Sequence, residues 1–150
     1  MRRRDQWIEW IREVERESET AAYAIELLQV QLRRDPSSLD YRDLGYSDFV
    51  STRENREATY LLRLFAVFEN GLRDAWSKSE GKTTHPGAND LINAFAARCR
   101  MPNDRVTDAH RIRVYRNSIV HEESESAEPA TLPEARRVLC RFFSFLPDEW

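Results

Sequence analysis

The sequence predicts an all-α protein, a helical bundle of about five helices. Apolar residues recur at spacings of three and four along most of the chain, and no segment shows the alternation of a half-buried strand. A length of 150 residues and a hydrophobic content of 41% suit one compact core. We therefore expect residues 1–150 to form a single domain.

The first predicted helix covers residues 4–34 and carries an apolar heptad stripe opposite a charged face. Such a helix is expected to lie along partner helices. Pro36 ends it, since proline cannot continue a helix, and residues 35–46 form a connection. The stripe consists of Trp7, Ile11, Val14, Ser18, Ala21, Ile25, Leu28 and Leu32.

The second predicted helix is long and supplies the centre of the core. We expect it to begin near residues 47–52, because Ser51 and Glu54 have capping-box spacing. Residues 77–88 form the longest polar break after it. Its core positions are Leu61, Leu64, Phe65, Phe68, Leu72 and Trp76.

Three shorter helices complete the prediction. One carries the apolar residues of segment 91–96, and the next runs from about Asp104 to His121. An acidic loop follows. The last helix opens at Thr131, where a threonine cap precedes Pro133 in the first turn and Glu134 at capping-box spacing.

Composition limits the classes of function. The net charge of −3 means that nucleic-acid contact requires a local basic patch, and six arginines do lie between Arg98 and Arg116. Cys99 and Cys140 form neither a disulfide framework nor a metal-binding pair, so we expect a cytoplasmic protein without metal or cofactor. No apolar run approaches the length of a membrane span, and we expect no membrane association.

The segment RNSIVHE, residues 116–122, holds the groups that metal-free RNA cleavage needs. Arg116 is a cation, Asn117 an amide, and His121 a proton carrier at neutral pH. Attack by the 2′-hydroxyl of RNA requires proton transfer and stabilisation of charge at phosphorus. The competing interpretation of His121 is a solvated histidine near a helix C-terminus, where its positive form is favoured.

A helical projection places Arg116, Asn117, His110 and His121 on the side opposite an apolar stripe of Ile112, Tyr115 and Ile119. Arg116 and His121 are nevertheless about 140° apart around the axis and about 7.5 Å apart along it. In a rigid helix these two side chains point too far apart to bind the same phosphate. Either the last turn unwinds at His121 or a second copy of the chain completes the site.

The motif Arg116-Asn117-Ser118-Ile119-Val120-His121, late in an all-helical chain and followed by one more amphipathic helix, resembles the signature of the HEPN superfamily. The resemblance implies a metal-independent endoribonuclease of toxin or antiviral-defence type, with a HEPN-like fold. It implies a homodimer in which the motifs of two protomers face each other. Arg116 would stabilise the scissile phosphate, Asn117 would orient it and His121 would act as acid and base, leaving 2′,3′-cyclic phosphate and 5′-hydroxyl ends.

Two further residues are candidates for substrate binding, Arg113 and Glu69. Glu69 would orient a motif residue from the second helix, since helical bundles build polar sites from facing helices. Its competing interpretation is a surface ion pair with Arg73, four residues on. Arg105 and His110 also have the motif spacing, but they lie at an ordinary helix start and lack the Asn.

Partners are suggested by the acidic loop that contains Glu122, Glu123, Glu125 and Glu128. It is either a solvated loop or a segment that gates the site or docks a basic partner, such as an antitoxin or regulatory protein. HEPN toxins silenced by a nucleotidyltransferase antitoxin often carry Tyr two residues after the motif His. Glu123 occupies that position here, so adenylylation there is not expected.

The main alternative function is a non-catalytic helical module that dimerises through the heptad face and binds a nucleotide or protein partner. A DNA-binding helix-turn-helix is disfavoured by the acidic net charge and the helix lengths. The four scattered glycines form no phosphate-binding loop, and no metal-binding pair or nucleophile elbow is present in the sequence.

Overall fold

The computed structural model describes residues 3–83, 86–121 and 127–150. Over these ranges the chain forms five α-helices and a short 3₁₀ helix, with no strand. The prediction of an all-α helical bundle is confirmed.

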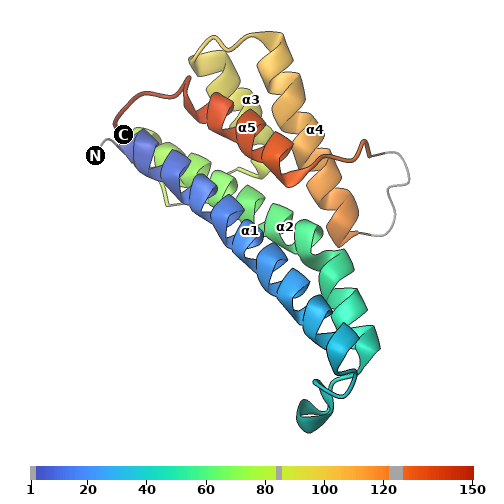
Figure 1. The fold of residues 1–150 in the computed structure, drawn as a ribbon. Coiled ribbons are helices and arrows are strands. Elements are labelled where there is room, and N and C mark those ends of the chain that lie inside the picture. Colours follow the sequence, from blue (N-terminus) through green and yellow to red (C-terminus); the bar gives the residue numbers. More distant parts are fainter. Residues whose placement is uncertain (1–2, 84–85, 122–126) are drawn as a thin grey trace.

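The two longest helices, α1 (Arg3–Arg34) and α2 (Tyr46–Glu80), form an antiparallel hairpin joined through the 3₁₀ helix η1 (Asp40–Arg42) (Figure 1). Ile11, Val14, Ser18 and Leu32 of the predicted α1 stripe are buried. The stripe's polar member, Ser18, accepts a hydrogen bond from Arg56 of α2. The η1 end of the hairpin projects beyond the other helices (Figure 1).

The helix α2 begins at Tyr46, one residue before the predicted range of 47–52. Its first turn is capped at Asp48 rather than at Ser51 and Glu54, because the Asp48 carboxylate accepts the backbone N–H of Gly45 at 2.7 Å. The helix continues four residues into the expected break of residues 77–88, as far as Glu80. Gly81, with a φ of 63°, then ends it in the left-handed conformation that glycine adopts without steric cost.

The helices α3 (Ala88–Arg98), α4 (Asn103–Val120) and α5 (Leu132–Phe143) pack together near the end of the hairpin that holds the two termini (Figure 1). As predicted, the Thr131 hydroxyl accepts the N–H of Glu134 at 3.3 Å and caps α5. The core between α2 and α5 contains four fully buried phenylalanines, which are Phe65, Phe68, Phe142 and Phe143.

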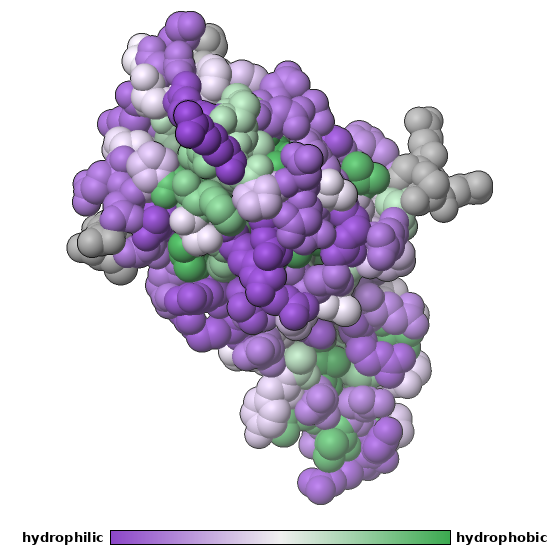
Figure 2. Space-filling model, turned by 90° about the horizontal axis from the view of Figure 1, so that it is seen from above, coloured by the Kyte–Doolittle hydropathy of each residue, from purple (hydrophilic) through white to green (hydrophobic). Residues whose placement is uncertain are grey.

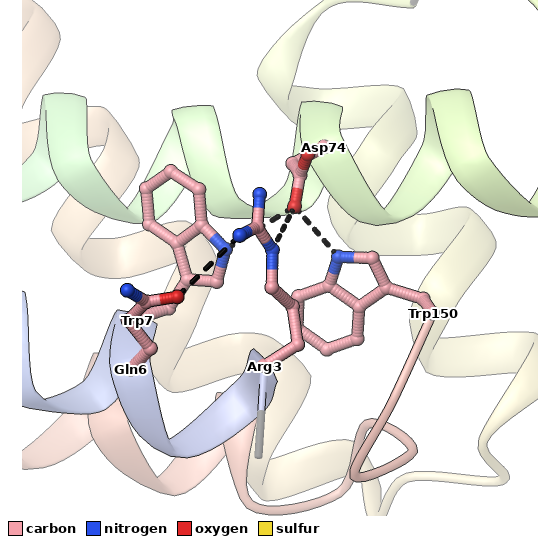
Figure 3. A network of polar contacts seen from close by, with 5 residues as sticks. All are labelled: Arg3, Gln6, Trp7, Asp74 and Trp150. Atoms are coloured by element: carbon pink, nitrogen blue, oxygen red, sulfur yellow. Dashed lines mark hydrogen bonds and ion pairs between the residues drawn. The ribbon is translucent and has the colours of Figure 1, made fainter. Parts of the chain in front are cut away.

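Residues near both chain termini form hydrogen bonds with one carboxylate of α2, that of Asp74 (Figure 3). Oδ2 of Asp74 accepts hydrogen bonds from Arg3 Nε at 2.9 Å, Trp150 Nε1 at 2.9 Å and Trp7 Nε1 at 3.4 Å. Segments far apart in sequence therefore meet at a single residue of α2.

The face drawn in Figure 2 is mainly hydrophilic, with hydrophobic side chains in small separate groups. Several large apolar side chains near the η1 end of the hairpin are exposed, including Tyr23, Leu27, Val30, Tyr41, Leu44 and Tyr46. Among the described residues, no helix is both long enough and apolar enough to span a bilayer.

Candidate functional site

Arg116 lies on α4 and is directed toward α2 rather than to open solvent. Its guanidinium carbon is 5.4 Å from the centre of the buried Phe65 ring, and its side chain is 31% exposed. A cation over an aromatic face is stabilised by the ring quadrupole. The helical projection had grouped Arg116 with the polar side of α4. That grouping is wrong, because Arg116 reaches across to the neighbouring helix.

Glu69 is the α2 residue that receives Arg116. One carboxylate oxygen, Oε2, is 3.8 Å from Arg116 Nη2, and the other, Oε1, accepts a hydrogen bond from Arg73 Nη2. Glu69 therefore pairs with Arg73, as the spacing of four residues predicted, and it also contacts a motif residue. Its side chain is only 12% exposed, so the carboxylate lies in a partly desolvated position where charge interactions strengthen.

Asn117 contacts Arg116 directly. Its side-chain oxygen accepts a hydrogen bond of 2.9 Å from Arg116 Nη1. The guanidinium is therefore held between an amide and a carboxylate. Arginine carries five N–H donors, so these contacts leave others for an anion.

His121 follows the last residue of α4 and has left the helix, with φ −118° and ψ 114°. Its backbone N–H still donates to the Asn117 carbonyl at 2.9 Å, while its side chain is exposed. The last turn of α4 is therefore intact, and only His121 itself adopts an extended conformation. In the described part of the chain, no hydrogen bond or ion pair joins its ring to Arg116.

Arg113 contacts a different histidine. Its Nε donates to His110 Nδ1 at 3.3 Å, and the other ring nitrogen of His110 is 2.8 Å from the Asn93 side-chain oxygen on α3. Nδ1 therefore accepts the hydrogen bond from Arg113, and Nε2 carries the ring proton and donates it to Asn93. This is the neutral Nε2-protonated tautomer. Burial lowers the pKa of His110, and the Arg113 cation lowers it further.

The arginines between Arg98 and Arg116 do not form one continuous basic surface. Arg98 pairs with Glu80 of α2, whereas Arg105 and Arg111 face α5. Arg105 is thereby separated from His110, which faces α3, so the earlier pair with the motif spacing does not form one site.

Phe65 and Asn93 were not among the residues singled out as site candidates, although both contact the polar residues of α4. Phe65 was expected only in the core. Its position one turn before Glu69 was the available signal, because residues four apart share a helix face. Asn93 carries no comparable signal, since the α3–α4 packing alone brings it to His110.

The acidic loop falls mostly outside the described residues, which exclude Glu122, Glu123 and Glu125. Glu128 is described, and it lies 4.0 Å from Arg111. Within the described ranges, no three His, Cys, Asp or Glu side chains are grouped as metal ligands.

Comparison with known proteins gives no relative. No family model matches the chain, and neither the curated proteins nor the solved structures contain a significant match.

Proposed function

We propose that this chain is a metal-independent endoribonuclease of HEPN type, acting as a homodimer in toxin or antiviral-defence systems. The observation that carries the proposal is the fixed orientation of Arg116, which lies between Glu69 and Asn117, five residues before the exposed His121. A preoriented cation and an exposed proton carrier on one segment suit the cleavage of a phosphodiester.

In the proposed reaction, the ribose 2′-hydroxyl attacks phosphorus and the bond to the 5′-oxygen breaks. One base must take the 2′-hydroxyl proton and one acid must protonate the leaving oxygen. Each protomer offers one exposed motif histidine, so two protomers supply the pair. Arg116 offsets the negative charge that grows on the phosphate oxygens, and Asn117 and Glu69 hold it in place.

The first experiment compares wild type, His121→Ala and His110→Ala on total RNA in EDTA, with mapping of the new ends. We expect 2′,3′-cyclic phosphate ends from wild type and His110→Ala, and none from His121→Ala. His110→Ala is the matched control, because it removes the same kind of side chain from α4, the helix that His121 directly follows. Equal cleavage by His121→Ala and wild type contradicts the proposed role of His121.

A second experiment tests the shared site. Arg116→Ala and His121→Ala are each expected to be inactive alone. Because the proposed site takes one His121 from each protomer, subunit exchange of wild type with an excess of His121→Ala should abolish most of the wild-type activity, since the mixed dimer keeps only one of the two proton carriers. Activity that stays proportional to the amount of wild-type chain, despite formation of the mixed dimer, argues against this arrangement.

The second candidate function is a non-catalytic module that binds a protein or nucleotide partner. It is favoured by the exposed apolar side chains Tyr23, Leu27 and Val30, spaced four and three residues apart on one face of α1. A chain of this kind would leave RNA intact in the first experiment. The free cysteines Cys99 and Cys140 suit either function in a reducing compartment such as the cytoplasm.

A further inference from the structure

A small basic hollow lies between α4 and α5, away from the motif residues. Arg105, Asp108 and Arg111 line it from α4, and Glu134, Arg137, Val138 and Arg141 line it from α5. We call this surface the arginine trough. Its α5 members follow helical spacing, so they share one face of the helix, and the hollow between the two helices has a volume of about 190 Å³.

The trough has an excess of positive charge. It is lined by four guanidinium groups and two carboxylates. Glu134 pairs with Arg111 and so neutralises that arginine, while Arg105 is 3.6 Å from Asp104, an exposed carboxylate outside the trough. Arg137 and Arg141 make no ion pair with any described residue.

Several other arginines differ from Arg137 and Arg141 in having a carboxylate partner. Arg136, the neighbour of Arg137 on α5, points to α1 and pairs with Glu15 at 2.9 Å. Arg3, Arg63 and Arg98 likewise have carboxylate partners on other segments. On α5, Arg137 and Arg141 lack such a partner among the described residues; they lie one turn apart and border the same hollow.

We infer that the arginine trough binds a phosphate group. Planar guanidinium groups pair with phosphate oxygens through two parallel hydrogen bonds, and arginine is favoured over lysine for such recognition. The volume is smaller than that of pockets which enclose whole ligands, so the phosphate enters and the rest of its molecule stays outside. Val138 supplies the apolar part of the wall.

The trough is a separate site from the proposed ribonuclease site. Arg111 and Asn117 are six residues apart on α4, which places them about 120° apart around the helix. The inference therefore does not depend on the proposed function. The phosphate comes either from a small phosphorylated molecule or from an RNA backbone, and the two sources are distinguished by experiment.

The test compares the double variants Arg137→Gln/Arg141→Gln and Arg33→Gln/Arg34→Gln. The second is the matched control, since Arg33 and Arg34 are exposed in the last turn of α1 and have no ion pair among the described residues. Binding of inorganic phosphate is measured by calorimetry in sodium chloride of constant ionic strength. Circular dichroism establishes that both variants keep the helical content of wild type.

We expect phosphate to bind wild type and the control alike, and the trough variant at least about tenfold more weakly. A second arm measures binding of a short single-stranded RNA in a His121→Ala background, so that no cleavage occurs. A parallel loss of RNA affinity in the trough variant identifies backbone phosphate as the ligand, whereas unchanged RNA affinity identifies a small phosphorylated molecule. The inference is overturned if the trough variant and the control do not differ in either arm.

Discussion

Glu69 Oε2 lies 3.8 Å from Arg116 Nη2, which joins the motif on α4 to the central helix α2. The same carboxylate binds Arg73 through its other oxygen, so one acidic group holds two cations. Because Glu69 is largely shielded from water, its charge is screened less than that of a surface carboxylate. The direction of the Arg116 side chain therefore depends on a residue outside the motif.

We expect Glu69→Gln to lower the free energy of unfolding by about 1 kcal/mol, since two guanidinium groups lose their counter-charge. It should also lower kcat/KM for the proposed ribonuclease reaction when assayed at a temperature where the variant is fully folded, because Arg116 loses its fixed orientation. Glu80→Gln, which breaks the more exposed pair with Arg98, is the control and should leave kcat/KM unchanged. Unaltered activity in both variants would show that Glu69 has no positioning role.

The sequence predicted the motif residues but not their directions. Helical periodicity correctly placed Ile112 in the core, yet it put Arg116 on the outer side of α4. A projection treats every side chain as radial, whereas a long arginine bends over a neighbouring ring and reaches a carboxylate several ångströms away. Which helix stands beside Arg116 depends on tertiary packing, and that information is absent from local spacing.

His110 is expected to titrate below the ordinary histidine value of about 6.5. Burial lowers its pKa first, and the Arg113 cation adds to the effect. The neutral ring therefore contributes stability above the ordinary pKa, and this contribution is lost as the pH falls through the lowered pKa of the folded state. NMR titration of the imidazole protons measures the pKa of His110, and Arg113→Met should raise that pKa. A midpoint unaffected by that substitution contradicts the contact with Arg113.

Gly71 is expected to be intolerant of substitution, a consequence that the sequence did not indicate. A Cβ atom there would lie 2.5 Å from Cζ of Phe143 and 3.1 Å from Cδ2 of Trp7. Phe143 is fully buried, so its ring has little room to move. Gly71→Ala should lower the unfolding free energy by about 1–3 kcal/mol in urea. Gly87→Ala is the control, because no atom lies within 4 Å of its Cβ position.

Local signals predicted some helix ends and missed others. Thr131 with Glu134 was found as a cap because both partners lie within one turn. The start of α2 was predicted to within one residue, but its cap was assigned to Ser51 and Glu54 instead of Asp48, because Ser51 and Glu54 have capping-box spacing and Gly45 has no side chain to signal a cap. The Asp74 cluster, which consists of Arg3, Trp7, Asp74 and Trp150, has no signal in the local sequence. Its members meet only after α1, α2 and the C-terminal segment have packed.

The Asp74 cluster should make stability depend on acid pH. Burial raises the pKa of Asp74, but hydrogen bonds from Arg3, Trp150 and Trp7, with the Arg3 charge, outweigh burial and leave the pKa below its ordinary value. Ionised Asp74 therefore stabilises the fold above the ordinary pKa of about 3.9, and this stabilisation is lost as the pH falls through the lowered folded-state value.

We expect Asp74→Asn to cost about 1–2 kcal/mol of unfolding free energy at neutral pH, because an amide oxygen accepts the same donors without the charge. Near pH 3 the difference from wild type should be smaller, because the Asp74 carboxylate binds a proton more readily in the unfolded chain than in the folded one. Urea unfolding at both pH values, followed by tryptophan fluorescence, measures this. The exposed Asp90→Asn control should change stability by only a few tenths of a kcal/mol at either pH. A cost for Asp74→Asn that is equal at both pH values would mean that shape, rather than charge, holds the termini to α2.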